Sequence, residues 1–262
     1  MAEFTSHAPG TFTWPELATT DQKAGVAFYR ALFGWDLNEM PMGPGETYSM
    51  FQMRGKSIGA ACALRPDERQ NGVPAHWNSY VTVANVDDSA KKAQSLGGKV
   101  FAPPFDVMDA GRMAVLQDPT GAVFCVWQPN KSIGAQILSE PGALCWTELT
   151  TSDTKAAEAF YTSLFGWTPK HSAAGAPMEY TEFSVGGTPS IGMMPKPKEM
   201  PAHIPSYWMP YFQVASADAS ASKAKELGAT VMVGPQDIPN TGRFAIASDP
   251  QGAVFAVFEF KV

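Results

Sequence analysis

Residues 9–37 read PGTFTWPELATTDQKAGVAFYRALFGWDL, and residues 141–169 read PGALCWTELTTSDTKAAEAFYTSLFGWTP. Sixteen of these 29 positions are identical when the two segments are aligned at an offset of 132. A second match lies near each end, where GRMAVLQDPTGAVFCVW (111–127) is similar to GRFAIASDPQGAVFAVF (242–258). A repeat this long indicates a duplicated domain, because solenoid repeats span only about 20–50 residues. We therefore predict a first domain over 9–130, a linker over 131–140 and a second domain over 141–262.

The composition excludes several classes of protein. The 262 residues suffice for two ordinary cores, and the net charge of −6 comes with scattered basic residues, which disfavours a nucleic-acid partner. No apolar run approaches the roughly 18 residues of a membrane span, and the N-terminal residues lack a signal-peptide pattern. Three cysteines without a C-x-x-C spacing suit a reducing compartment. We expect a cytoplasmic protein that binds a small molecule and neither nucleic acid nor membrane.

Each half of the chain shows the same order of elements. Alternation over Thr11–Thr19 predicts a strand, and helical spacing follows from a cap at Asp21 to a left-handed end at Gly34. Three short strands complete a β-α-β-β-β unit, at Trp35–Glu39, Thr47–Met53 and Ser57–Leu64.

A second unit follows within the first half, after a linker over 66–76 that is rich in proline and charge. Its predicted elements are a strand at Trp77–Val83, a helix at Asp87–Leu96 and strands at Lys99–Ala102, Arg112–Gln117 and Ala122–Gln128. The second half repeats both units over 143–194 and 207–260. The fold class is thus α+β, with two units in each of two tandem domains.

With these motifs the chain resembles the vicinal oxygen chelate superfamily, which includes glyoxalase I, the bleomycin-resistance proteins and the extradiol dioxygenases. The resemblance is carried by Ala-Phe-Tyr followed by Leu-Phe-Gly-Trp and by the closing Gly-Arg…Asp-Pro-x-Gly-Ala-Val-Phe, in both halves. It implies that each pair of units curls into an open eight-stranded mixed-sheet cup. We expect the two halves to pack as an intrachain pseudo-dimer and the chain to be a monomer, since two-fold pairing is common for such units.

The resemblance also implies three metal-ligand positions in each cup. They fall on Trp14, Asn78 and Cys125 in the first half and on Trp146, Met209 and Ala256 in the second. Neither set offers three ligands of the usual kinds, so we predict no metal and no other cofactor. A register shift of two residues keeps the same strand face and would bring in Glu16 and His76, so a divalent metal remains the alternative.

Glu16 and Glu148 are the candidate catalytic residues. Each stands two residues after a Trp on a first strand, so each shares the face of that Trp. A carboxylate against an indole inside a cup is poorly solvated, which raises its pKa and suits a general acid or base. The alternative is a structural carboxylate that accepts backbone hydrogen bonds at a strand edge or at the interdomain seam.

The candidate ligand-binding residues are aromatic, polar or charged. Two arginines next to a Gly could clamp an anion, or could instead pair with Asp118 and Asp249. The thiol at position 125 could be a nucleophile, but no base lies near it in the sequence, which favours a small buried residue. The aromatic rings either line a ligand cavity or fill it as core. The full set is Trp14, Tyr48, Trp77, Asn78, Tyr80, Arg112, Cys125 and Trp127 in the first half, and Trp146, Tyr180, Trp208, Met209, Tyr211, Arg243 and Phe258 in the second.

Three functions remain open at this point. The first is a glyoxalase-like enzyme, of lyase, isomerase or hydroxylase-like type, that acts without metal on a small carbonyl-bearing or aromatic metabolite. The second is a bleomycin-resistance-like protein that sequesters a drug or metabolite in an apolar cup. The third is a metal-dependent lyase or dioxygenase with displaced ligands. The repeated Glu favours the first, because a sequestering cup has little need of a carboxylate beside an indole.

Overall fold

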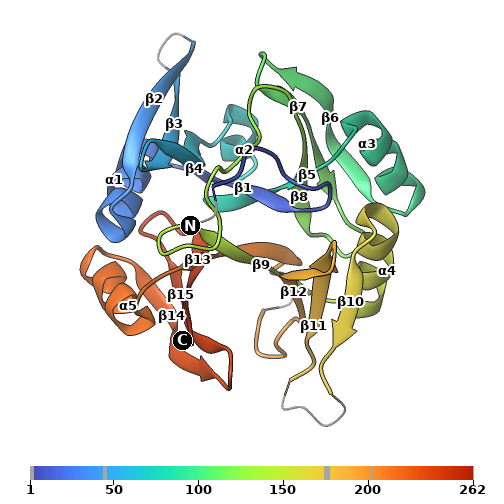
Figure 1. Ribbon diagram of the computed structural model, residues 1–262. Coiled ribbons are helices and arrows are strands. Elements are labelled where there is room, and N and C mark those ends of the chain that lie inside the picture. Colours follow the sequence, from blue (N-terminus) through green and yellow to red (C-terminus); the bar gives the residue numbers. More distant parts are fainter. Residues whose placement is uncertain (1–2, 44–45, 174–177, 202, 262) are drawn as a thin grey trace.

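The computed structural model describes residues 3–43, 46–173, 178–201 and 203–261. The strands of the first half form one eight-stranded sheet in the order β2-β3-β4-β1-β5-β8-β7-β6, and those of the second half form another in the order β10-β11-β12-β9-β13-β16-β15-β14 (Figure 1). The expected α+β fold of two tandem eight-stranded mixed sheets, neither of them closed, is confirmed.

The elements of the first half are β1 (Phe12–Thr19), α1 (Gln22–Phe33), β2 (Asp36–Gly43), β3 (Glu46–Met53), β4 (Lys56–Ala63), α2 (Pro66–Gln70), β5 (His76–Thr82), α3 (Val86–Ser95), β6 (Lys99–Val107), β7 (Gly111–Gln117) and β8 (Val123–Pro129). Those of the second half are β9 (Leu144–Thr151), α4 (Thr154–Phe165), β10 (Thr168–His171), β11 (Thr181–Val185), β12 (Thr188–Pro195), β13 (Tyr207–Gln213), α5 (Ala217–Glu226), β14 (Thr230–Ile238), β15 (Gly242–Ser248) and β16 (Val254–Phe260).

The local signals act as expected. The Asp21 side chain accepts the Ala24 N–H at 3.0 Å and begins α1, and Gly34 ends it at φ 76°, a backbone conformation that costs glycine little. The segment 66–76 is more than a linker, because Pro66 starts the short helix α2. Strands β2 and β6 run longer than predicted, since the edge strands of a curled sheet continue past their apolar residues.

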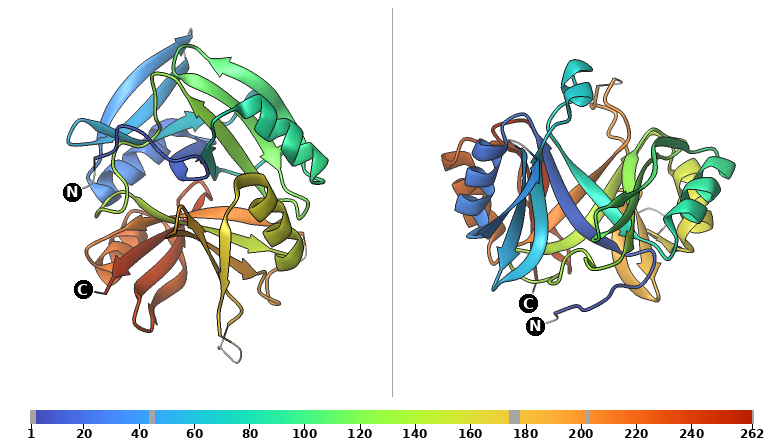
Figure 2. Two further views of the ribbon diagram at one scale, coloured as in Figure 1. Left: turned by 45° about the vertical axis from the view of Figure 1, so that its right-hand side comes forward. Right: turned by 90° about the horizontal axis from the view of Figure 1, so that it is seen from above.

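Each sheet joins two units through its first strands. β1 pairs antiparallel with β5 and parallel with β4, and β9 pairs in the same way with β13 and β12. Both sheets curl, so each has a concave inner face. We call the inner face of the first sheet the first cup and that of the second sheet the second cup. Helices α1, α3, α4 and α5 lie on the outer faces, and the cups open in opposite directions (Figures 1 and 2).

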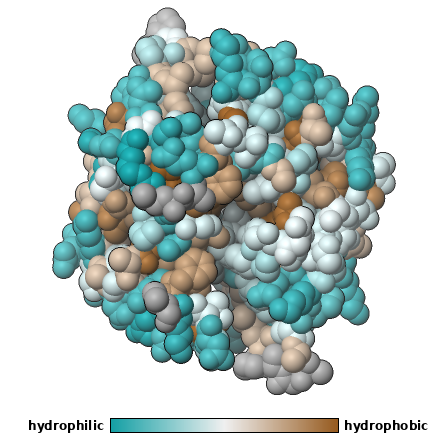
Figure 3. All heavy atoms as spheres, viewed as in Figure 1, coloured by the Kyte–Doolittle hydropathy of each residue, from teal (hydrophilic) through white to brown (hydrophobic). Residues whose placement is uncertain are grey.

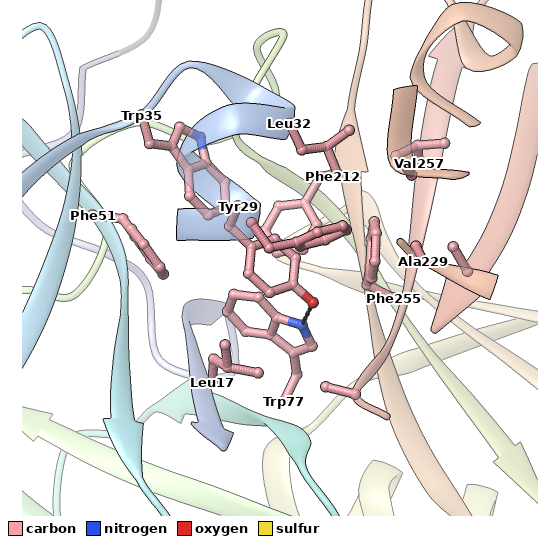
Figure 4. Packing of buried hydrophobic residues seen from close by; sticks show 14 of the residues in the cluster. Leu17, Tyr29, Leu32, Trp35, Phe51, Trp77, Phe212, Ala229, Phe255 and Val257 are labelled. Carbon is pink, nitrogen blue, oxygen red and sulfur yellow. Dashed lines mark hydrogen bonds between the residues drawn. The ribbon is translucent and has the colours of Figure 1, made fainter. Parts of the chain in front are cut away.

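The outer faces of the two sheets share their cores across the domain boundary. Helix α1 lies beside α5 and α3 lies beside α4 (Figure 2). One core joins Tyr29, Trp35 and Trp77 of the first half with Phe212 and Phe255 of the second (Figure 4). A matching core joins α3 and β8 with α4 and β13. The expected packing of the two copies into a pseudo-dimer is therefore what the structure shows, while the monomeric state in solution stays a prediction.

Two equivalent hydrogen bonds cross this boundary deep in the cores. The Tyr29 hydroxyl donates to Asp249 at 3.0 Å and accepts the Trp77 indole N–H at 3.0 Å. The Tyr161 hydroxyl likewise donates to Asp118 at 2.9 Å and accepts the indole N–H of Trp208 at 2.9 Å. Each buried carboxylate thus accepts the tyrosine of the other domain on its Oδ2 atom, while its Oδ1 atom accepts backbone N–H groups of its own turn.

No helix in the described part of the chain is both long and apolar enough to cross a membrane. Polar side chains cover much of the face drawn in Figure 3, with apolar residues in small groups between them.

We predict that Tyr29→Phe and Tyr161→Phe each lower the free energy of unfolding by about 1–3 kcal/mol, because each leaves a buried Asp oxygen without its partner. The two hydroxyls belong to separate cores, so the losses in the double variant should add. Urea denaturation measures both effects. An unchanged midpoint in either single variant would show that these bonds do not hold the domains together.

Candidate functional site

The first cup is built around one carboxylate. Glu16 projects from β1, and its Oε2 atom accepts the Tyr48 hydroxyl at 2.5 Å while its Oε1 atom accepts the Tyr80 hydroxyl at 2.8 Å. The Asn78 amide nitrogen approaches Oε1 at 3.4 Å, and the Trp14 indole N–H donates to the Tyr48 hydroxyl at 3.0 Å. Strands β1, β3 and β5 thus direct four polar side chains to one point of an apolar face.

The second cup repeats this arrangement. Glu148 on β9 accepts the Tyr180 hydroxyl on Oε2 and the Tyr211 hydroxyl on Oε1, both at 2.8 Å. The indole N–H of Trp146 donates to the Tyr180 hydroxyl at 3.1 Å. Met209 stands where the first cup has Asn78, so here the carboxylate has no amide neighbour. We call each Glu with its two Tyr partners a carboxylate clamp.

The clamps fix the protonation states of the tyrosines. Burial and the adjacent carboxylate raise the pKa of Tyr48, Tyr80 and Tyr211 well above the ordinary value, so these hydroxyls remain neutral donors. Burial raises the pKa of Glu148, while the bonds from its two tyrosines oppose this shift. The pKa of Glu148 is therefore higher in the folded chain than in the unfolded chain. As a result, the contribution of Glu148 to stability is greatest at low pH and is lost as the pH rises through the raised pKa of the folded chain.

The remaining inner-face predictions divide between the two cups. Trp127 lies in the first cup, and its indole N–H donates to the Ser132 carbonyl of the linker at 2.9 Å. Phe258 lies in the second cup with Met209 and Tyr211. Cys125 is 1% exposed in the first cup, where burial and the Glu16 charge raise its thiol pKa. The thiol is therefore protonated and buried, which favours the small buried residue over a nucleophile.

Two of the predicted ring positions are wrong. Trp77 and Trp208 lie on the outer faces, in the shared cores, where they donate to Tyr29 and Tyr161. Alternate residues of a strand point to opposite faces, so Trp77 cannot share the inner face with Asn78 and Tyr80.

The two arginines also face away from the cups. Arg112 pairs with Asp87 at 2.8 Å and with Asp106 at 2.9 Å. Arg243 pairs in the same way with Asp218 and Asp237. The expected partners Asp118 and Asp249 are wrong, because those carboxylates serve the interdomain tyrosines. Each of these two arginines thus holds the start of a helix against a strand, and neither forms an anion clamp that points into a cup.

The donors in the cups do not make up a three-ligand metal site. In the part of the chain that the structure describes, no three His, Cys, Asp or Glu side chains lie close enough together to hold an ion. In the first cup, Glu16 is a hard oxygen donor, but its neighbours are the Asn78 amide and a protonated thiol. The His76 ring contacts the Pro74 carbonyl at 2.8 Å, at the start of β5. The register shifted by two residues therefore places Glu16 on the inner face, but it does not complete a set of three metal ligands.

The cups differ in how closely their walls approach the carboxylate. Gly192 of β12 lies against Tyr180 and Trp146, and a Cβ built there would be 1.9 Å from the Tyr180 hydroxyl and 2.6 Å from the Trp146 indole nitrogen. The first cup has Ala60 at the equivalent position. Correspondingly, Glu148 is only 6% exposed, whereas Glu16 is half-buried. The second clamp is thus more enclosed.

Sequence reasoning missed the residues along the cup edges. Met40 lies opposite Tyr48 in the β2–β3 pair, and Phe105 lies opposite Met113 in the β6–β7 pair, so both extend the inner face of the first cup. Met40 is 37% and Phe105 44% exposed. Apolar residues that recur at every second position along β3 and β7 indicate an inner face in the sequence. Only the register of the strand pairs shows which residues of β2 and β6 extend that face. We call the inner-face residues of β2 and β6 the lips.

Two shallow hollows lie near the rim of the second cup. One of about 270 Å³ is lined by charged and polar residues of β10 and β11, including Lys170, Tyr180 and Glu182. The other, of about 470 Å³, lies at the β14–β15 turn beside Arg243 and Phe260. Glu148 lines neither of them.

Comparison with known proteins identifies the group to which this geometry belongs. The profile described as the Glyoxalase/Bleomycin resistance protein/Dioxygenase superfamily matches residues 11–126 and 143–257. A protein named as a candidate glyoxylase, CFP32, from Mycobacterium tuberculosis is 42% identical over 260 residues, covering 99% of this chain and 98% of that protein. The anthracycline biosynthesis protein DnrV of Streptomyces peucetius is 33% identical, covering 98% of this chain and 96% of its own.

Solved structures show the same fold at low identity. The Mn(II)-bound glyoxalase from Novosphingobium aromaticivorans superposes with a TM-score of 0.65 at 15% identity, covering 97% of this chain and 83% of that one. The 2,3-dioxygenase LapB from Pseudomonas sp. KL28 gives a TM-score of 0.64 at 15% identity, covering 100% and 94%. These matches bear on the fold alone.

We predict that Gly192→Ala displaces Tyr180 from Glu148 and lowers the free energy of unfolding by about 1–3 kcal/mol, because the added methyl group overlaps the Tyr180 hydroxyl. Loss of that bond also raises the pKa of Glu148 further, so the loss of stability grows with pH.

The matched control is Ala60→Gly in the first cup, which removes the equivalent methyl group and costs at most about 1 kcal/mol. Urea denaturation at several pH values compares the two variants. Equal, pH-independent losses in both would contradict the tighter packing of the second clamp.

Proposed function

The chain belongs to the Glyoxalase/Bleomycin resistance protein/Dioxygenase superfamily, and from this premise we propose that it is an enzyme that transfers a proton on a small carbonyl-bearing compound without a bound metal. The observation that carries the proposal is the carboxylate clamp, which occurs in both cups. A carboxylate in an apolar site, held at both oxygens by neutral donors, is oriented and poorly hydrated, as a general base should be.

The substrate class follows from the walls of the cups. Trp14, Trp127 and the tyrosine rings give the first cup planar apolar surfaces, which suit an aromatic or other flat metabolite. The relatives support this class by their names, since one is named as a candidate glyoxylase and another as an anthracycline biosynthesis protein. We therefore propose a flat, carbonyl-bearing metabolite as the substrate.

The proposed step breaks a C–H bond next to the substrate carbonyl. The Glu16 carboxylate takes the proton, and the electron pair of the broken bond moves into a C=C bond as the carbonyl oxygen becomes an enolate oxygen. The second N–H of the Asn78 amide can donate to that oxygen, and the Tyr80 hydroxyl can turn its one O–H from Glu16 to that oxygen once the carboxylate is protonated, which stabilises the charge that develops there. Return of the proton to a different carbon gives an isomer, and loss of a leaving group from the enolate gives a lyase product.

The chemistry of the donors supports metal independence. The Mn(II)-bound glyoxalase shares the fold, but among the described residues of this chain no three His, Cys, Asp or Glu side chains lie close enough together to hold an ion. We propose that the tyrosine and asparagine donors supply the stabilisation of charge that a metal ion provides elsewhere.

A second candidate function is sequestration of an aromatic ligand. It is favoured by Glu148, which is 6% exposed and fully engaged by its own tyrosines, so the second clamp can hold a wall in place without any chemistry. In that case the aromatic rings of the cups bind the ligand, and the role of the carboxylates is to orient the tyrosines.

We predict that the protein accelerates hydrogen–deuterium exchange at the carbon next to the carbonyl of aromatic hydroxyketones. Glu16→Gln should slow this exchange at least about tenfold, because the amide cannot accept the proton, and that factor corresponds to about 1.4 kcal/mol of transition-state stabilisation. NMR in deuterium oxide follows the reaction across a panel of ketones, aldehydes and quinones.

Glu148→Gln is the matched variant in the other cup, and elemental analysis of the gently purified protein accompanies the assay. Exchange that both variants leave unchanged would remove the carboxylates from the chemistry. A stoichiometric divalent metal whose removal abolishes exchange would instead establish a metal-dependent enzyme with displaced ligands.

A further inference from the structure

We infer that the two cups have opposite polarity and that only the first takes a ligand: an amphipathic aromatic compound whose hydroxyl end reaches Glu16 and whose apolar body lies between the lips. The inference deepens the proposed function and rests on it only in taking Glu16 as the group that meets the ligand. Three independent observations on the two cups carry it.

The first observation is access to the carboxylate. Glu16 is half-buried, and a carboxylate has about four acceptor sites, of which the two tyrosine hydroxyls use only part. A ligand hydroxyl can therefore donate to Glu16 without breaking the clamp. Glu148 is 6% exposed behind Tyr180, so a ligand would have to displace that ring first.

The second observation is the packing that sets this difference. In the second cup, Tyr180 and Trp146 lie directly on the backbone of β12, which only Gly192 allows. In the first cup, the methyl group of Ala60 occupies the equivalent place, directly opposite the more exposed carboxylate of Glu16 in the β1–β4 pair. One methyl group thus keeps the first cup open at the level of its carboxylate.

The third observation is the chemistry of the lips. In the first cup, the lips carry the exposed apolar side chains of Met40 and Phe105, and Met50 and Met113 lie next to them on the inner face. Methionine side chains adapt their shape at little cost, so they can part to admit a flat ring system. The partly exposed Asn78 amide approaches Glu16 with one N–H and has a second N–H that can orient a carbonyl next to the ligand hydroxyl.

In the second cup the polarity is reversed. At the positions equivalent to Met40, Met50 and Phe105 stand Ser172, Glu182 and Gln236, and Glu182 pairs with Lys170 at 3.3 Å. Apart from the enclosed Glu148 clamp, its floor is apolar, with Met209, Ala256 and Phe258.

Polar side chains at the lip positions, with the Lys170–Glu182 pair beside them, do not suit the apolar body of an amphipathic ligand that enters with its polar end first. The hollows at this rim do not change the assignment, because Glu148 lines neither of them and the Lys170–Glu182 and Arg243–Asp237 pairs lie in their walls.

The test uses 1-naphthol as a non-reactive probe, with 1-methoxynaphthalene as the analogue that cannot donate. Calorimetry of the full chain should show one 1-naphthol per chain, and at least about tenfold weaker binding of the methoxy compound, since a site that accepts a hydroxyl rejects its ether. Glu16→Gln should weaken 1-naphthol by a similar factor, and Glu148→Gln should leave it unchanged.

The lips are tested by exchanging the equivalent residues of the two cups. Met40→Ser with Phe105→Gln gives the first cup the lip of the second, and Ser172→Met with Gln236→Phe does the reverse. The first double variant should weaken 1-naphthol at least about fivefold with the thermal midpoint unchanged, since these side chains are exposed, and the second should have no effect.

The inference is overturned by two bound probes per chain, by loss of binding in Glu148→Gln instead of Glu16→Gln, or by equal affinity for the ether. It is also overturned if 1-naphthol does not bind at up to about 1 mM. Its failure is distinguishable from that of the proposed function: binding in the first cup without proton exchange supports the inference and removes the enzyme, whereas exchange that depends on Glu148 does the opposite.

Discussion

The structure depends on two buried carboxylates that each accept a tyrosine hydroxyl from across the domain boundary, in addition to backbone N–H groups of their own turn. Asp118 and Asp249 sit in the turns that precede the last strand of each half, and each accepts a tyrosine hydroxyl from a helix of the other half. A buried charge without a partner is costly, so these bonds favour one relative orientation of the domains. With the helices and outer faces fixed together, both concave faces must point outward. The cups exist as open surfaces because the interdomain cores occupy the other side of each sheet.

The same chemistry recurs at the centre of each cup, with a different consequence. Tyrosine hydroxyls hold Glu16 and Glu148 as they hold the aspartates, but these carboxylates face the concave side, where a ligand can enter. An interdomain aspartate has used its bonds for structure. A glutamate in a cup can still accept a hydrogen bond from a ligand where the ligand can reach its carboxylate. Whether such a clamp is structural or reactive therefore depends on exposure, and exposure differs between two sites with almost the same donors.

Duplication made that divergence possible. The halves share the clamp, the Trp beside it and the Tyr–Asp bonds, which are the features that the fold and the pairing of domains require. They differ at residues around the clamps and along the cup edges, such as Ala60 against Gly192 and Met40 against Ser172. Relatives that match the whole chain at 33–42% identity also span both halves, so the tandem arrangement is a property of this group of proteins and not of this chain alone. One copy can therefore retain a ligand-binding site while the other retains only a structural role.

The sequence by itself determined the duplication, the α+β class, the β-α-β-β-β units and the helix caps at Asp21 and Gly34. These follow from local periodicity and from a repeat at fixed offset, which need no long-range information. It also placed Glu16 and Glu148 on the face of a tryptophan. The partners of these groups came only from the tertiary structure. Trp77 lies on the outer face because alternation is strict along β5, and Arg112 pairs with Asp87 because α3 begins beside β7. Strand register and sheet curvature determine which tyrosines reach a carboxylate. They also determine how closely a tyrosine ring packs against the backbone at a glycine. Both are set by contacts between residues far apart in the chain, so no local pattern records them.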